Sequence, residues 1–577
     1  MNFVLQFIKN HFFAILLSLT VGILYISPQL FFQLELGENY HGIYLAGTDN
    51  EEYYSGRIRE IFDGHYFAGN PFLYEERNDI FFQPPLGELV FLPLKIIFSD
   101  TSSIVWGTRF IFPIILFLII YVFFYLVIKN KFIASAIGVF ILLGSQIAYS
   151  PKELINFIQL KFSNLNNISF LTYSRPVIPE ISSMVFFLFL IFLYFSITKP
   201  ERKFPYIAGI LFGASIYIYI YSWLYILTLS MLFFVFYFIK KERMMIARII
   251  RIGITGLVVS LPYWIIFYFT IHGLNYMATA ERYNLYASRQ FVFSKIVFAS
   301  LILLLLAYYK QEKNNFYYFS LLLLATGFIV INQQIITGKI LFLGHFHWYF
   351  NVPIGIAVLT YSLFRIVYRN LKVFSYCFLF FILIRNFGYA IVVQKNSYYF
   401  MYPKYSQMQT WGKIFSRLDK EYENEEVILS NNRNFSINVS TYTHHYPYDG
   451  IYSHLNNTNP KRLLYNIFLL AWMRGVEAGA EENFYNATKA DLSRFTGGAR
   501  NKRLYGCMEC LSNEEKSSFA NQYKNFIEKK EYEKMNASRL DILVWDDKLN
   551  STMPEYLQQK ISLLWEVDNL KIYKFSF

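Results

Sequence analysis

Residues 104–128 read IVWGTRFIFPIILFLIIYVFFYLVI, and this run indicates the class of the fold. Arg109, near its start, is its single charged side chain, and Lys129 and Lys131 follow the run almost at once. The hydrocarbon core of a bilayer needs about 20 consecutive apolar residues in one helix. The run therefore predicts a membrane-spanning helix with a basic loop behind it.

The composition of the whole chain agrees with a membrane protein. Of the 577 residues, 55% are hydrophobic and only 16% are charged, against about 25% charged in soluble domains. Disorder is excluded because it requires low hydrophobicity and high charge. Three cysteines are too few for a disulfide scaffold.

Further apolar blocks surround the first one and predict a polytopic α-helical membrane protein with about 11 transmembrane helices. The block nearest the N-terminus, 11–32, is longer than the apolar part of a usual signal peptide and lacks a clear small-residue cleavage site, so it is expected to stay as an anchor. The predicted spans are 11–32, 104–128, 132–150, 181–198, 205–220, 222–239, 250–270, 291–309, 316–336, 348–367 and 372–394.

The charge distribution orders these helices across the membrane. The net charge of +13 comes from 53 basic and 40 acidic residues. From Lys395 onward there are 24 basic and 22 acidic residues, so 29 basic and 18 acidic residues lie before it. Sixteen of those 29 basic residues, with only three acidic ones, fall in alternate short loops. Such loops are typical of the cytoplasmic side. We therefore expect a multi-pass plasma (inner) membrane protein with a cytoplasmic N-terminus and no nucleic-acid partner.

The block 204–239 could form one long helix, but both of its flanks are basic. Two cytoplasmic flanks require an even number of crossings between them, so a tight turn is expected near Tyr221, Ser222 and Trp223. With eleven crossings, the C-terminal part of the chain lies outside the cytoplasm. The chain then divides into a membrane body, 1–395, and an extracytoplasmic soluble domain, 396–577.

The terminal domain is predicted to be α/β. Val427–Ser430 and Leu540–Trp545 are apolar runs of strand length, and Lys461–Val476 has a helical pattern between them. Cys507 and Cys510 have a redox-like or half-zinc spacing, but no second cysteine pair completes a four-sulfur site. A local disulfide or two free thiols is expected there.

The first outer loop, 33–103, holds 12 of the 18 acidic residues of the membrane body. Ile58, Ile61 and Phe62 form one apolar helical face, and the apolar stretch Leu86–Phe98 is too short to span. Both segments are expected to be interfacial helices that lie along the membrane surface. A loop of this length is usually functional.

Three carboxylates follow the first span in the stretch TDNEEYY, residues 48–54: Asp49, Glu51 and Glu52. Carboxylates at a membrane edge can act as general bases, bind a metal or remain solvated. Burial raises the proton affinity of a carboxylate and suits it to base catalysis near neutral pH. The alternative is an acidic helix start, in which Asp49 caps and the glutamates favour the positive end of the helix dipole. The two interpretations can coexist.

Cations and histidines outside the spans are candidates for binding an anion. Arg175 lies in YSRPVIPE, residues 173–180, where prolines restrict the backbone. Arginine can hold a phosphate or a carboxylate through two parallel hydrogen bonds; the alternative is an interfacial arginine that contacts lipid headgroups. Arg282 is in a later outer loop. His345 and His347 are two residues apart, which places both on one side of an extended segment. They could bind a metal or a phosphate; hydrogen-bonded packing is the more ordinary role for such a pair.

Several of these stretches resemble the GT-C superfamily of polytopic glycosyltransferases, which includes protein O-mannosyltransferase-like and aminoarabinose-transferase-like enzymes. The likeness covers about residues 1–395. Its paired acidic signature is imperfect, because Asn50 follows Asp49 and the acids resume at Glu51. The matching stretches are Asp49–Tyr53, Arg57–Glu60, Gly69–Phe72 and Ser174–Pro176.

The resemblance implies an inverting transfer of a sugar from a polyprenyl-phosphate donor to a lipid, glycan or protein acceptor outside the cytoplasm. Asp49 would be the general base, and Arg175, helped by Arg282 or His347, would stabilise the departing lipid phosphate. No cofactor is required, and a divalent metal is an option. The implied substrate-binding residues are Glu51, Glu52, Arg57, Arg175, Arg282, His345 and His347.

Two other classes of function fit parts of the sequence. A transporter or lipid flippase usually carries charged residues inside its spans near the midplane of the bilayer, whereas here the acids crowd one outer loop. A non-catalytic scaffold with an outer binding domain would need none of the site residues. Loss of sugar transfer in an Asp49→Asn variant that folds normally would separate the enzyme from both.

Overall fold

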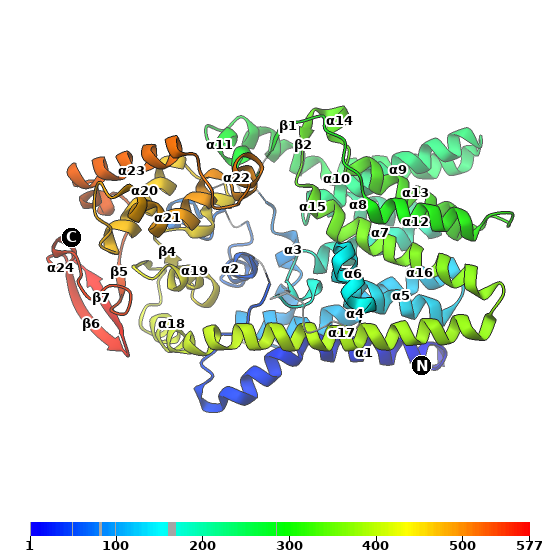
Figure 1. The fold of residues 1–577 in the computed structure, drawn as a ribbon, viewed down its shortest axis with the longest axis horizontal. Coiled ribbons are helices and arrows are strands. Elements are labelled where there is room, and N and C mark those ends of the chain that lie inside the picture. Colours follow the sequence, from blue (N-terminus) through cyan, green and yellow to red (C-terminus); the bar gives the residue numbers. More distant parts are fainter. Residues whose placement is uncertain are drawn as a thin grey trace.

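The structure is a computed structural model, and it describes residues 2–48, 50–67, 69–79, 83–98, 100–159, 169–283 and 285–576. A bundle of long helices forms one half of the molecule, and a five-stranded sheet lies in the other half (Figure 1). The N-terminus is at the far end of the bundle, and the C-terminus is at the opposite end of the molecule beside the sheet. The fold is that of a multi-pass membrane protein with a C-terminal mixed β-sheet region.

Among the described residues, nine helical stretches are long and apolar enough to cross a membrane. Some continue through a short turn, as α5 does through η4 (Ser145–Tyr149). Their principal helices are α1 (Asn2–Leu36), α4 (Thr101–Ile128), α5 (Lys131–Gly144), α7 (Glu180–Thr198), α9 (Ile220–Ile239), α10 (Arg243–Ile271), α13 (Asn315–Val330), α16 (Val352–Tyr368) and α17 (Lys372–Gln407).

The other two predicted spans are helices, but each has only 13 residues: α8 (Lys203–Ser215) and α12 (Lys295–Ala307). Thirteen residues rise roughly 20 Å, less than the hydrocarbon thickness of about 30 Å. The predicted turn in block 204–239 exists, but it falls at residues 216–219, before the predicted Tyr221–Trp223. The predicted position of the turn is wrong, because α9 already begins at Ile220, and a pair of crossings in this block stays a prediction.

The first outer loop contains the helix α2 (Glu51–Phe62), the short turns η2 (Tyr74–Glu76) and η3 (Leu92–Ile96), and α3 (Leu86–Leu89). Most of α2 is buried, and it is not exposed to lipid as a surface helix would be. Helix α19 (Arg433–Tyr442) covers it: a Cβ added at Gly56 would lie 3.4 Å from the Ser440 side chain. In Figure 1, α2 is seen end-on between α19 and the bundle.

Strands from distant parts of the chain form the sheet in the order β4-β3-β5-β7-β6. β3 is parallel to β4 and β5, and β7 is antiparallel to β5 and β6. The predicted strands near 427 and 540 are β3 and β5, and the predicted helix near 461 is α20 (Pro460–Met473). The bounds are β3 (Val427–Ser430), β4 (Tyr446–Pro447), β5 (Ile542–Asp546), β6 (Ile561–Val567) and β7 (Leu570–Phe575).

Alternate residues of the central strands face opposite sides of the sheet, as the two-residue period of a strand requires. Ile428 and Ile542 belong to the core shared with α19 and with α18 (Gln409–Glu421). Leu429 and Leu543 belong to a separate core, to which the helices on the other side of the sheet contribute. Those helices are α20, α21 (Glu481–Thr496) and α23 (Asn513–Glu528).

The remaining elements join the two halves or close the terminal part. Cys507 and Cys510 form a disulfide just after α22 (Gly498–Tyr505), one of the two outcomes expected from their spacing. The predicted boundary between the membrane body and the soluble domain, at residue 395, falls inside the continuous helix α17. The division into these two domains stays a prediction. These elements are η4, α6 (Pro151–Ile158), η6 (Thr172–Ser174), α11 (Tyr276–Arg282), β1 (Tyr286–Ala287), α14 (Gln334–Thr337), β2 (Lys339–Ile340), α15 (Leu343–Phe346), η7 (His347–Asn351), η8 (Ile451–Leu455), α22 (Gly498–Tyr505), η9 (Glu531–Ala537) and α24 (Glu555–Gln558).

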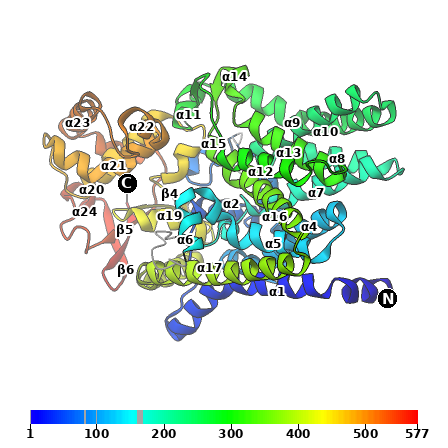
Figure 2. The ribbon, with the colours of Figure 1, turned by 45° about the vertical axis from the view of Figure 1, so that its right-hand side comes forward.

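Two loops of the bundle, one within 33–103 and one that contains α11, meet the terminal part at the segment 453–459. The Asn70 side chain donates to the Thr458 hydroxyl at 3.1 Å and accepts from the Asn456 amide at 3.1 Å. Arg282, at the end of α11, donates to the Thr458 carbonyl at 3.2 Å. Figure 2 shows α11 beside α22 and the terminal helices, as Figure 1 does. These hydrogen bonds hold the terminal part against the first outer loop and against α11.

Candidate functional site

The first outer loop enters α2 through a buried ion pair. The Glu51 carboxylate pairs with the Arg109 guanidinium on α4, and both side chains are buried. Its other oxygen accepts hydrogen bonds from the backbone amides of Gly47 and Thr48 at 3.2 Å, and from the Thr48 hydroxyl at 2.8 Å. Glu51 therefore fixes the two residues that precede Asp49.

Arg57, in the middle of α2, forms a second buried ion pair. Its Nε donates to the Glu88 carboxylate on α3 at 2.5 Å, and both side chains are 1% exposed. Its Nη2 donates to the Gln83 carbonyl at 2.8 Å. The contacts of Arg57 thus join α2 to α3, and its role in substrate binding stays a prediction.

Arg175 lies between α2 and η7. Its Nε donates to the Ile178 carbonyl at 2.5 Å, and its Nη2 donates to the Tyr349 hydroxyl at 2.8 Å. The guanidinium carbon is 5.4 Å from the ring centre of Tyr54, on α2, within the range of a cation–π contact. The side chain is partly exposed. Arg175 is therefore held against the first turns of α2 with part of its surface open.

The backbone beside Arg175 is strained. Val177 has a φ of +64°, a left-handed conformation that is an outlier for a β-branched residue. Val177 is fully buried, and a Cβ added at Gly87 would meet its Cγ1 at 2.5 Å. Strain of this kind gathers at ligand and catalytic sites when the surrounding structure holds it in place.

A backbone hydrogen bond brings the Arg175 segment to the carboxylate stretch. The Phe170 amide donates to the Gly47 carbonyl at 3.0 Å. Together with the contact between Arg175 and Tyr54, it places the described residues 47, 48 and 50–54 beside residues 170–175. Asp49 itself lies outside the described residues, so its role as the general base stays a prediction.

Glu52 points from α2 to the terminal part. Its carboxylate accepts from the Tyr405 hydroxyl on α17 at 3.3 Å and from the Tyr452 hydroxyl on η8 at 3.4 Å. Burial raises the pKa of the Glu52 carboxyl. Glu52 is thus placed where the bundle and the terminal part meet, with a proton affinity suited to acid or base chemistry.

The two histidines point to different surroundings, because their segment is helical and not extended. The His345 ring, in α15, packs beside Tyr219 and Tyr221, with ring centres 5.6 and 4.8 Å away. His347, in the π-helical turn η7, lines a cavity. Tyr349, in the same turn, binds Arg175. η7 therefore connects the cavity with Arg175.

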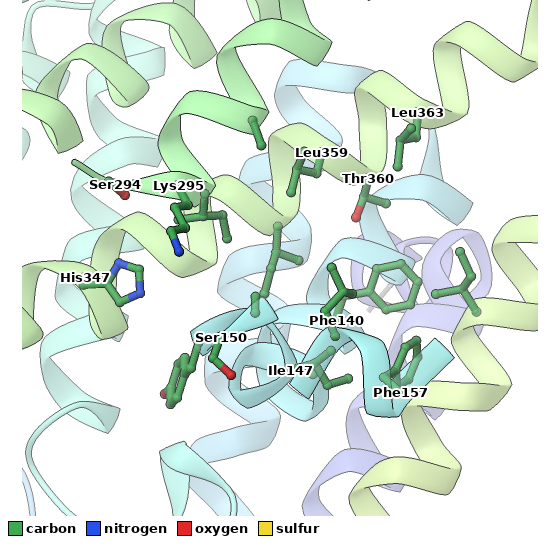
Figure 3. Close-up of a pocket in the computed structure, with 18 of the residues that line it drawn as sticks. Phe140, Ile147, Ser150, Phe157, Ser294, Lys295, His347, Leu359, Thr360 and Leu363 are labelled. Carbon is green, nitrogen blue, oxygen red and sulfur yellow. The ribbon is translucent and has the colours of Figure 1, made fainter. Parts of the chain in front are cut away.

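This cavity, of about 680 Å³, lies between α5, α6, α12, α16 and α17. Figure 3 shows Ser150, Ser294, Lys295 and His347 toward one end, and Leu363 and Phe157 toward the other. Most of the lining is apolar. It runs from His347 to Val367, which is roughly 30 Å along a helix and matches the thickness of the hydrocarbon core.

Arg282 does not line this cavity. Its nitrogens donate to the carbonyls of Ala278, His454 and Thr458 at 3.1 to 3.3 Å, and to the Thr279 hydroxyl at 3.1 Å. Burial lowers its pKa to about 10, so it stays charged at neutral pH. Arg282 joins α11 to the terminal part, and its predicted contact with substrate remains a prediction.

Three residues of the site were not singled out from the sequence: Arg109, Lys295 and Tyr349. Arg109 is the single charge in the run 104–128, and Lys295 is the single charge in the predicted span 291–309. Charged residues inside predicted spans are functional candidates by default, so this signal was available. Tyr349 carries no such signal, because it is one of 48 tyrosines.

Asp419, His444 and His445 could hold a metal, since their ligand atoms lie within 4.8 Å of one another. However, the Glu426 amide donates to Nδ1 of His445 at 3.0 Å. Burial lowers the pKa of His445 to about 4, so its neutral ring carries the proton on Nε2, which faces Asp419 at 3.8 Å. A protonated nitrogen is no ligand, and the three residues fit a hydrogen-bond network better than a metal site.

His65, after α2, gives the contact between the first outer loop and the terminal part a pH dependence. Its Nδ1 lies 2.8 Å from Glu60 and its Nε2 3.3 Å from Glu425, with Asp63 and Tyr446 nearby. The hydrogen bond to Glu60 raises the pKa of His65 above its ordinary 6.5. A raised pKa means that the stabilisation is complete below pH 6.5 and is lost as the pH rises through the raised value.

We therefore expect a His65→Gln variant to melt at a lower temperature than the wild type at pH 6, and the difference to shrink as the pH rises above neutrality. Thermal unfolding in detergent at several pH values measures it. His272→Gln, a change at the end of α10, is the matched control and should show no such trend. A constant difference across this pH range would contradict the assignment.

No family model and no curated protein matches the sequence. Among solved structures, the chain is similar to the apo Archaeoglobus fulgidus oligosaccharyltransferase, with 12% identity, 93% of this chain and 70% of that chain covered, and a TM-score of 0.46. It is also similar to ArnT from Cupriavidus metallidurans bound to undecaprenyl phosphate, with 9% identity, coverage of 96% and 97%, and a TM-score of 0.42. Both matched proteins are GT-C membrane glycosyltransferases.

Proposed function

We propose that this protein transfers a sugar from a polyprenyl-phosphate donor to an acceptor at the outer face of the membrane. The observation that supports it is the long apolar cavity with Lys295 and His347 at one end. A polyprenyl-phosphate sugar has the complementary shape, a long apolar chain with an anionic head. In this proposal the polyprenyl chain of the donor lies along α16, and its phosphate-sugar head lies near η7.

The cations near η7 are suited to the leaving group. Sugar transfer releases a polyprenyl phosphate, on which negative charge develops as the bond to the anomeric carbon breaks. Arg175 is already oriented by Tyr349 and Ile178, so it needs little rearrangement to stabilise that charge. Lys295 lies at the polar end of the cavity and would hold the phosphate from the other side.

The carboxylates of the first outer loop would activate the acceptor. Asp49 takes the proton of an acceptor hydroxyl while the hydroxyl oxygen forms its bond to the anomeric carbon. The bond from that carbon to the phosphate oxygen breaks on the opposite face, so the configuration inverts. Glu51 is committed to Arg109, which leaves Asp49 and Glu52 as the candidate bases. A divalent metal is not needed for this step.

The topology belongs to the same proposal. A cytoplasmic N-terminus places the first outer loop, α2 and the terminal part outside, in the plasma (inner) membrane. There the terminal part, 396–577, would cover the site through Tyr452 and bind a lipid, glycan or protein acceptor.

The proposal is tested with the purified protein in lipid nanodiscs and radiolabelled polyprenyl-phosphate sugars, by following the release of polyprenyl phosphate. We expect Lys295→Gln to raise the KM for the donor by roughly 10- to 150-fold, because a charge-assisted hydrogen bond contributes about 1.5–3 kcal/mol. Lys310→Gln, beyond the other end of α12 and outside the cavity lining, is the matched control and should leave KM unchanged. Donor turnover with equal KM in both variants would contradict this use of the cavity.

A further inference from the structure

Helix α6 forms one wall of the cavity and is weakly held by the rest of the fold. Leu154 and Phe157, one turn apart, line the cavity, while Ile155 and Ile158 are 51% and 67% exposed on the outside. Residues 152–158 are all exposed or only partly buried. An eight-residue helix is not stable alone in water, so tertiary contacts must keep α6 in place.

Arg385 on α17 supplies such a contact. It stands 13 residues after Lys372, the first residue of α17, so it lies roughly 20 Å along the helix and within the thickness of the hydrocarbon core. Its neighbours Phe381 and Ile384 are 59% and 54% exposed, as side chains that face lipid are. A charged side chain at this depth is costly and is expected to have a function.

The guanidinium of Arg385 is directed at the last turn of α6. Nη2 donates to the Phe157 carbonyl, and the guanidinium carbon lies 5.0 Å from the centre of the Phe157 ring. The last carbonyls of a helix have no partner within it and carry the negative end of its dipole, so a cation is favourable there. Phe157 therefore joins the cation on one side to the cavity on the other.

We propose that Arg385 is a positioning residue that holds α6 over the cavity and thereby limits the rate at which a lipid chain enters from the bilayer. Figures 1 and 2 both show α6 beside α17, and Figure 3 shows Phe157 at the cavity. The identity of the lipid, a polyprenyl phosphate, rests on the proposed function. The contact of α6 with Arg385 does not depend on the proposed function.

The position of α6 can be measured without any substrate. Spin labels at Ile158→Cys and Tyr399→Cys, in a background in which the exposed Cys377 is replaced by serine, report the distance between α6 and the outer part of α17. We expect a narrow distribution with Arg385 present and a broad one in Arg385→Leu. Phe157→Leu keeps the carbonyl and removes the ring, so it should broaden the distribution less. It also serves as the test if Arg385→Leu does not fold.

The effect on the lipid is measured as the release of a fluorescent polyprenyl phosphate from the protein in nanodiscs. We expect Arg385→Leu to release it at least 10-fold faster, and Arg385→Lys to release it at a rate between those of Arg385→Leu and the wild type. Arg369→Leu, near the end of α16, is the control and should not change it. Unchanged distances, or broadened distances with an unchanged release rate, would overturn the proposal. If the wild type does not bind the lipid saturably, the proposed function fails, and the distances alone decide whether Arg385 holds α6.

Discussion

A Glu51→Gln variant is expected to lose about 3–5 kcal/mol of stability, the cost of removing one partner from a buried ion pair. Arg109 would keep its charge inside the bundle, where it is 3% exposed, with the Leu45 carbonyl as its described remaining acceptor. The amide nitrogen of the new side chain would face donors in either orientation: the backbone amides of Gly47 and Thr48, or the Arg109 guanidinium. The stability of the protein falls, and the backbone of Gly47 and Thr48 loses the carboxylate that holds it in place.

Thermal unfolding in detergent measures the first effect, and donor turnover measures the second. Glu38→Gln removes an exposed carboxylate of the same loop and is the matched control. The double variant Glu51→Gln with Arg109→Met removes both partners, and we expect it to recover part of the lost stability, because an uncompensated buried charge no longer remains. A double variant no more stable than Glu51→Gln would show that the charge pairing is not what stabilises this contact.

Asp49→Asn is expected to reduce sugar transfer by roughly 10²–10⁴-fold, the usual contribution of a general base. The donor should bind as before, because its chain and phosphate lie against other residues, so kcat falls while donor binding is retained. Single-turnover transfer and binding of a fluorescent polyprenyl phosphate measure the two separately.

Glu52→Gln distinguishes the two candidate bases. Tyr405 and Tyr452 donate to different oxygens of Glu52. A glutamine keeps one of these acceptors, and its amide nitrogen can donate to the other hydroxyl, so the side chain stays in place. We therefore expect roughly a 10-fold or smaller loss of transfer, well below a general base's contribution. A larger loss in Glu52→Gln than in Asp49→Asn would transfer the role of base to Glu52. Equal transfer in both variants and the wild type would exclude base catalysis by this loop.

The sequence predicted the bundle well because hydropathy reports burial in lipid directly. All eleven predicted blocks are helical in the structure. It could not predict that α8 and α12 are short, because apolar residues continue into the turn after α8 and flank α12 at both of its ends. It also missed the hairpin of β6 and β7, since β6 is an edge strand with exposed leucines at 563 and 564 and lacks a clear two-residue alternation.

The site was predicted less completely than the fold, for a different reason. The tract at 48–54 and Arg175 carry local signals, and the structure brings their segments together. Whether a charged residue has a buried partner depends on helices far away in the chain, as in Glu51 with Arg109 and Arg57 with Glu88. No local pattern distinguishes such a paired charge from one that is open to substrate.

The uninterrupted course of α17 from Lys372 to Gln407 makes it a rigid strut between the membrane and the sheet. Each residue added to an α-helix advances it by about 1.5 Å and rotates it by about 100°. One residue inserted after position 394 would thus swing the whole terminal part around and separate Tyr452 from Glu52. Lengthening by five full turns, 18 residues, would restore the orientation but lift that part roughly 27 Å away. The helical phase and the length of this strut therefore jointly determine whether the two halves can form one site.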